Sequence, residues 1–151
     1  MSLRISLLFK LLFVLYIITG IYLSSNMSIS HDEWHEQNTW EVNLRAILSF
    51  FNDTYNYEEL LTYKDRYFGI AFHIISQPFQ YLLNSYISDL NNLELDRGYL
   101  VSRHIPTFLI FSFSGIIFYK ICIKISKSEY FSYISSSIYL TYPYLFGHSL
   151  M

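Results

Sequence analysis

The chain is poor in cysteine and in charge, and each shortage excludes a class of protein. Its 151 residues include one cysteine, Cys122, which excludes an internal disulfide framework, a four-cysteine zinc site and a CxxC redox pair. Charged residues make up 15% of the chain, whereas a soluble domain carries about 25%. The net charge of −2, with no block of Lys and Arg, argues against nucleic acid as the main partner. Hydrophobic residues instead reach 52% and aromatic residues 20%, so the composition predicts an integral membrane protein.

Long apolar runs predict where the chain crosses the membrane. They cover about residues 5–23, 105–123 and 130–151, and each approaches the length of about 20 residues that a spanning helix needs. Arg4 and Lys10 at the start of the first run favour a cytoplasmic N-terminus. A cleaved signal peptide is the alternative for this run. We favour a retained anchor, because SSNMS contains no clear small-x-small cleavage site.

The segment between the first two runs, residues 24–104, is predicted to be an outer loop. It contains eleven of the twelve acidic residues and five of the ten basic ones, as the positive-inside rule expects. Within it, the apolar residues of Trp40–Phe51 recur at helical spacing and predict an amphipathic helix. Asn38 or Thr39 is the expected N-cap of this helix.

A second amphipathic helix is expected over Tyr67–Ile87. This stretch is apolar enough for a fourth span, but Pro78 lies near its middle and polar residues follow one stripe of it. That pattern favours a helix lying in the membrane interface. The predicted fold is therefore all-α: a polytopic membrane protein with three spans and two juxtamembrane amphipathic helices, its 151 residues forming one portion of a membrane domain. The polar stripe comprises His73, Gln77, Gln80 and Asn84.

The densest polar cluster, HDEWHE, follows the first apolar run. Its carboxylates and imidazoles suit a general base or a divalent-metal site, and a helix would place His31 and His35 on one side. The string does not fit the HExxH zinc motif, because Glu33 follows the first histidine one residue too late. The alternative is a solvated helix start, in which Asp32 and Glu33 favour the helix dipole.

Two further candidates are expected at the outer membrane surface. Arg103 begins the second span, and His148 lies near the outer end of the third. The predicted topology brings both toward Asp32 and Glu33. Carboxylates beside cations suit a reaction at a lipid phosphate, because the carboxylate takes a proton while the cations neutralise the leaving phosphate.

The order of these features resembles the N-terminal part of a GT-C type membrane glycosyltransferase, of the mannosyltransferase and aminoarabinose-transferase kind. In that family a first span is followed by an Asp-Glu pair, two juxtamembrane helices and an Arg-led second span that ends in basic residues. Here the pair is Asp32-Glu33, and the Arg-led span is SRHIPTFLIFSFSGIIFYKICIK. The stretch YLTYPYLFGHSLM is similar to the end of the third span in bacterial members.

This resemblance implies transfer of a sugar from a dolichyl- or polyprenyl-phosphate-linked donor to an acceptor at the outer membrane face. Asp32 would be the catalytic base, with inversion at the anomeric carbon, and Glu33 would support it. A divalent cation near Glu33 is the one cofactor left open. The implied location is the inner (plasma) membrane of a bacterium, with membrane lipids as partners. The expected substrate-binding residues are Arg103 at the phosphate, His148, His31 and His35.

Two other classes are weighed against this one. Members of the family have many more spans, so we expect the chain to be an N-terminal fragment that is inactive in isolation. The first alternative is a small non-enzymatic membrane subunit or anchor, for which the acidic pair would be replaceable. A transporter fragment is the other, but its charges should line a cavity at the membrane midplane rather than gather at one surface.

Overall fold

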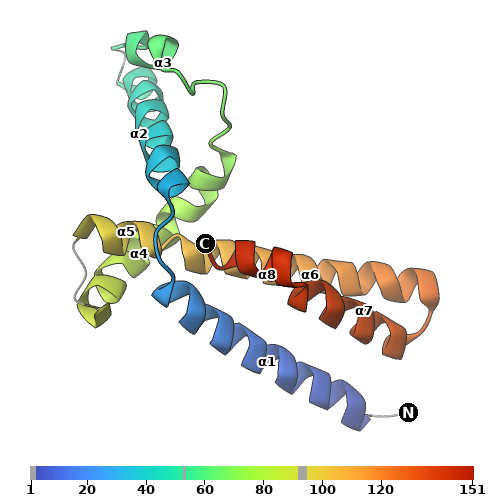
Figure 1. Ribbon diagram of the computed structural model, residues 1–151. Helices are drawn as coiled ribbons and strands as arrows, with labels where there is room; N and C mark the ends of the chain where they lie inside the picture. The colour runs from blue at the N-terminus through green and yellow to red at the C-terminus, as the bar shows by residue number, and fades with distance from the viewer. Residues whose placement is uncertain (1–2, 53, 92–94) are drawn as a thin grey trace. The chain divides into compact units, whose positions relative to one another are not determined.

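The computed structural model describes residues 3–52, 54–91 and 95–151, and these ranges are helical with no strand (Figure 1). The all-α prediction is confirmed. The chain divides into two compact units, which we name the apolar unit (Met1–Ser28 with Val101–Met151) and the loop unit (Ile29–Leu100). The helices are α1 (Leu3–Asn26), α2 (His31–Phe51), α3 (Glu58–Thr62), α4 (Ala71–Asn91), α5 (Leu95–Val101), α6 (His104–Ser126), α7 (Glu129–Thr141) and α8 (Pro143–Ser149).

Among the residues that the structure describes, two stretches are long and apolar enough to cross a membrane, Leu7–Asn26 and Arg97–Ser126. In the apolar unit α1 and α6 run antiparallel, because the end of α1 meets the start of α6: His104 Nδ1 lies 3.0 Å from the carbonyl oxygen of Ser24. Helices α6 and α7 form a tight hairpin around Lys127, whose φ of 52° is left-handed. These contacts make α7 parallel to α1.

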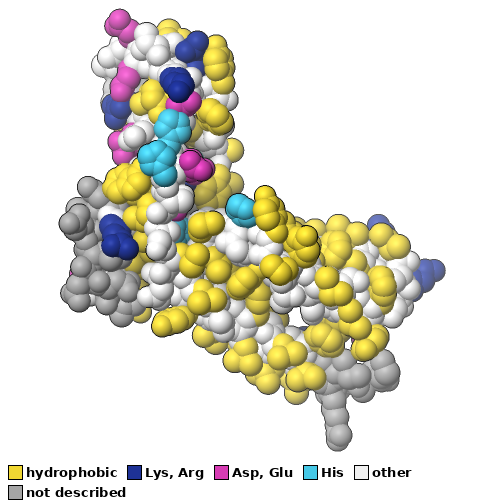
Figure 2. Space-filling view, viewed as in Figure 1, with side chains coloured by type: hydrophobic (Ala, Val, Ile, Leu, Met, Phe, Trp, Pro, Cys, Tyr) yellow, Lys and Arg dark blue, Asp and Glu magenta, His cyan; other side chains and the backbone are white. Residues whose placement is uncertain are grey.

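Packing in the apolar unit places small residues inside and large apolar residues outside. Gly20 of α1 abuts the buried ring of Phe108, and Gly115 of α6 abuts Leu140 of α7. Large side chains along the outer faces of α1, α6 and α7 are exposed, and Figure 2 shows hydrophobic side chains across the visible surface of these helices. Close approach over small residues with apolar side chains turned outward is typical of helices that pack in lipid.

The helix expected over residues 130–151 is interrupted. Helix α7 ends at Thr141 and α8 begins at Pro143, because proline lacks an N–H and its ring clashes with the preceding turn. The 13 residues of α7 extend about 20 Å, less than the hydrocarbon core of about 30 Å. The hydroxyl of Tyr16 donates to the carbonyl oxygen of Leu140 at 3.2 Å, so α1 supplies a donor at the end of α7.

In the loop unit, α2 begins nine residues before Trp40, and the predicted cap at Asn38 or Thr39 is wrong. Ser30 occupies the N-cap, and its backbone N–H donates to Glu33 Oε1 at 2.7 Å. This is the reciprocal arm of a capping box. The second predicted helix is displaced as well, since Tyr67 lies in a turn and α4 begins at Ala71.

Helix α4 turns its polar stripe toward the interior of the loop unit. His73, Gln77 and Gln80 are buried, and apolar residues on the other face, such as Ile75 and Phe79, are exposed. The amide of Gln77 donates to Gln80 Oε1 at 2.8 Å, and the amide of Gln80 donates to the backbone oxygen of Tyr99 in α5 at 2.8 Å. The hydroxyl of Tyr99 donates to Gln77 in return. The amide stripe therefore joins α4 to α5, and the apolar face of α4 is left without cover inside this unit.

Candidate functional site

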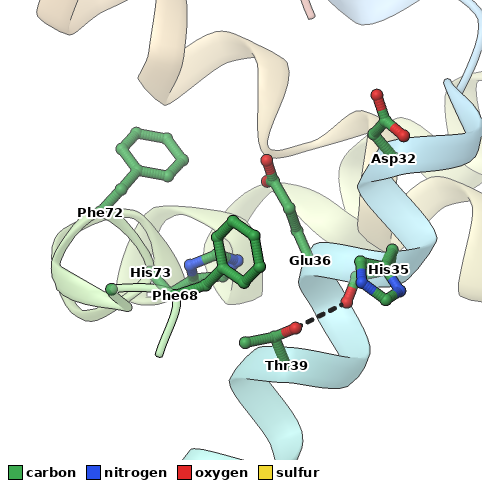
Figure 3. A pocket seen from close by; sticks show the side chains of 8 residues that line it. Asp32, His35, Glu36, Thr39, Phe68, Phe72 and His73 are labelled. Carbon is green, nitrogen blue, oxygen red and sulfur yellow. Dashed lines mark hydrogen bonds between the residues drawn. The ribbon is translucent and has the colours of Figure 1, made fainter. Parts of the chain in front are cut away.

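A pocket of about 480 Å³ lies in the loop unit, between the first half of α2 and the segment that leads into α4 (Figure 3). Its volume is in the range of small-molecule sites. The lining residues are Asp32, His35, Glu36 and Thr39 of α2, Phe68 and Gly69 of the connecting segment, and Phe72 and His73 of α4.

One wall of the pocket is a single face of α2. Asp32 and Glu36 are one turn apart, as are His35 and Thr39, so helical spacing alone places the four side chains on neighbouring rows. The hydroxyl of Thr39 donates to the backbone oxygen of His35 at 3.0 Å (Figure 3). Thr39 is therefore satisfied within the helix, while the carboxylates of Asp32 and Glu36 are on exposed residues.

The opposite wall is formed where the chain returns from α3 alongside α2 (Figure 1). Two side-chain contacts hold this return. His35 Nε2 lies 2.8 Å from Asp65 Oδ2, and the hydroxyls of Thr39 and Tyr63 lie 3.2 Å apart. These contacts place Phe68 and Gly69 at the pocket.

His73 is a buried lining residue, with an exposed fraction of 5%. Its ring stacks on that of Trp40 with 5.8 Å between centroids and 9° between planes. A stacked, buried imidazole has little freedom to turn, so His73 presents a fixed edge to the pocket.

The lining of the pocket contains acidic side chains and no basic ones apart from histidine. Asp32 and Glu36 contribute carboxylates, His35 is matched by Asp65, and no Lys or Arg is among the lining residues. Over the part of the chain that is described, no group of three or more His, Cys, Asp or Glu side chains could hold a metal ion.

A second charged contact lies at the far end of α2, outside this pocket. Arg45 Nε donates to Glu59 Oε2 at 2.8 Å, and a second guanidinium nitrogen reaches the other carboxylate oxygen. This bidentate hydrogen bond lowers the pKa of the Glu59 carboxyl and raises the pKa of Arg45. Both side chains are exposed, so the pair orders α3 against α2 more than it stabilises the fold.

The four candidates from the HDEWHE cluster have different settings. Asp32 and His35 line the pocket, His31 is exposed in the first turn of α2, and none of the pocket's lining residues is Glu33. Glu33 is buried, with its carboxylate engaged at the helix start. The structure therefore gives Glu33 a capping role.

The remaining two candidates belong to the apolar unit. Arg103 is buried at the N-cap position of α6, with an exposed fraction of 4%. His148 is exposed in α8, where its ring lies 4.4 Å from that of Tyr144. The proposed gathering of Arg103 and His148 with the acidic pair remains a prediction.

Sequence reasoning missed most of the pocket. Glu36 was visible as the residue one turn after Asp32, and His73 as the first member of the polar stripe. Phe68 and Phe72 carry no local signal of their position, because they depend on the return of the chain along α2.

No family model, curated protein or solved structure matches this chain. The resemblance to GT-C glycosyltransferases therefore rests on the short motifs described above.

Proposed function

We propose that this protein is embedded in the membrane and transfers a sugar from a polyprenyl-phosphate-linked donor, with Asp32 as the catalytic base. The observation that carries the proposal is the pocket itself. It brings Asp32, the first acid after the apolar helix α1, together with Glu36 and two aromatic residues in a cavity of small-molecule size.

The apolar unit supports the membrane part of the proposal. Its three long elements alternate in direction, so that the N-terminal half of α1 and the Lys124 end of α6 lie toward the same side, as the stacking of Phe9 on Tyr133 indicates. Basic residues at that side fit a cytoplasmic end. In this proposal α1, α6 and the broken pair α7–α8 cross the bilayer, and α2 and α4 are the juxtamembrane helices of the outer loop.

The proposed chemistry is an inverting displacement at the anomeric carbon. The acceptor hydroxyl attacks that carbon while the Asp32 carboxylate takes its proton. A new glycosidic C–O bond forms and the C–O bond to the lipid phosphate breaks, so the phosphate leaves with the electron pair. Glu36 replaces Glu33 as the second carboxylate beside the base, because the carboxylate of Glu33 is held by the backbone of Ser30. Arg103 and His148 stay as candidates for the phosphate.

The test is sugar transfer by the intact protein, at the length at which its host makes it, in proteoliposomes with a panel of radiolabelled polyprenyl-phosphate hexoses. Replacing Asp32 with asparagine keeps the size of the side chain and removes the base, so we expect transfer to fall at least about a hundredfold. The matched control is Asp89→Asn, an equivalent change at an exposed position of α4 outside the pocket. Equal transfer by Asp32→Asn and the control would remove Asp32 from the mechanism.

A second candidate function, a non-enzymatic membrane subunit, is favoured by the exposed apolar end of α2. Leu48, Phe50 and Phe51 are uncovered there, although they lie in an acidic loop. In that case the chain would co-purify with a partner, and Asp32→Asn with Glu33→Gln would leave the complex intact.

A further inference from the structure

We propose that the pocket binds a ligand carrying a positively charged amino group. The identification of this ligand as the sugar acceptor rests on the proposed function, whereas its charge follows from the pocket alone.

The first argument is the charge of the lining. Asp32 places an exposed carboxylate at the pocket, and none of its lining residues is Lys or Arg. The imidazole of His35 adds no excess positive charge, because Asp65 lies 2.8 Å from it. A phosphate entering this space would face like charge, whereas an ammonium group would be attracted.

The second argument is the aromatic wall. Phe68 and Phe72 line the pocket opposite the carboxylates of α2 (Figure 3). Phe68 is 67% exposed, so its ring is accessible to a ligand. The faces of aromatic rings attract cations, and carboxylates with aromatic faces are the elements of ammonium recognition.

The third argument is the polar base of the pocket. His73 and Thr39 are buried there, and His73 is fixed by its stacking on Trp40. A ligand that fills about 480 Å³ therefore meets a fixed imidazole edge at depth, Asp32 at the rim and the rings of Phe68 and Phe72 in the wall, which suits a small amine whose body packs on those rings.

Calorimetry on the full chain in nanodiscs of neutral lipid tests the inference. The probes are glucosamine at a pH where its amino group is charged, N-acetylglucosamine as the uncharged analogue, and N-acetylglucosamine 6-phosphate as the anion. We expect glucosamine to bind about tenfold more tightly than N-acetylglucosamine, and the phosphate to bind most weakly. Asp32→Asn should remove the preference for the amine, and the matched control Asp89→Asn should retain it.

Equal binding of glucosamine and N-acetylglucosamine, tighter binding of the phosphate, or no binding of glucosamine would each overturn the inference. A preference for the amine that survives Asp32→Asn would overturn the placement of the ligand. The two proposals fail separately. Amine binding without sugar transfer leaves this inference standing and removes the proposed function, and transfer without an amine preference does the reverse.

Discussion

Replacing Gly20 with alanine tests the close approach of α1 and α6. An alanine Cβ at this position would lie 1.9 Å from Cζ of Phe108 and 2.4 Å from each Cε. The Phe108 ring is fully buried, with the rings of Tyr16 and Phe146 at centroid distances of 5.3 and 6.4 Å. The ring therefore has no free space into which it can turn.

The expected cost follows from this geometry. Carbon atoms pack at about 3.5–4.0 Å, so the ring and the new methyl group must separate by at least about 1.5 Å. Overpacking of this kind destabilises a protein by about 1–3 kcal/mol. The better helix propensity of alanine offsets at most about 1 kcal/mol of this loss. We expect a net loss of about 1–2 kcal/mol in the free energy of unfolding.

The assay is equilibrium unfolding in mixed micelles of dodecyl maltoside and SDS, followed by circular dichroism. Gly147→Ala is the matched control, since an alanine Cβ built at Gly147 meets nothing within 4 Å, and it should unfold at the same SDS fraction as the parent or a higher one. Combining Gly20→Ala with Phe108→Leu should cost less than the sum of the single changes, because leucine removes the atoms that clash. If Gly20→Ala matches the control, or if the double change is additive, α1 and α6 do not meet as described.

Three further predictions concern the helix ends. Glu33→Ala should lower the free energy of unfolding by about 0.5–1.5 kcal/mol and speed amide hydrogen exchange in the first turn of α2, because the N–H of Ser30 loses its acceptor. Glu33→Gln should have the smaller effect, and equal effects of the two changes would contradict the capping role. The Arg45–Glu59 pair lowers the pKa of the Glu59 carboxyl, so its contribution to stability is present above the ordinary carboxyl range and is lost as the pH falls through the lowered value. Unfolding of the parent and of Glu59→Gln across acidic pH should show a larger loss of stability in the parent, because other carboxylates titrate in both proteins, and an equal or smaller loss in the parent would contradict the sign. Pro143→Ala should join α7 and α8 into one helix, and electron–electron resonance distances between spin labels on the two helices should lengthen; an unchanged distance would assign the break to another cause.

The long apolar helices were predictable because their signal is local. Hydropathy located α1 and α6 within a few residues of their ends, since a spanning helix needs only a continuous apolar run. The start of α2 carried a local signal too, because Ser30 and Glu33 have the spacing of a capping box. The resemblance to glycosyltransferases assigns Glu33 to catalysis, whereas this spacing assigns it to the helix cap.

The pocket was not predictable in the same way, because its walls meet through contacts between distant residues. Asp65 reaches His35 across 30 positions, and this contact brings Phe68 beside α2. The direction of the α4 stripe also depends on a distant partner, Tyr99. Its backbone oxygen accepts from Gln80 and its hydroxyl donates to Gln77, so both amides have hydrogen-bond partners when they are buried. A periodic pattern identifies the two faces of a helix, but the partner decides which of them is buried.

The hydrogen bond from Tyr16 to Leu140 couples the residue at position 16 to the proline at position 143 during evolution. The Leu140 carbonyl needs an outside donor because Pro143 ends the helix ladder beside it, and the phenol of Tyr16 supplies one. A related chain that lost the proline would continue its helix and satisfy that carbonyl internally, so phenylalanine would become acceptable at position 16. A chain that kept the proline would be selected for a hydroxyl there. Sequences descended from a common ancestor should therefore show tyrosine at position 16 and proline at position 143 gained or lost together.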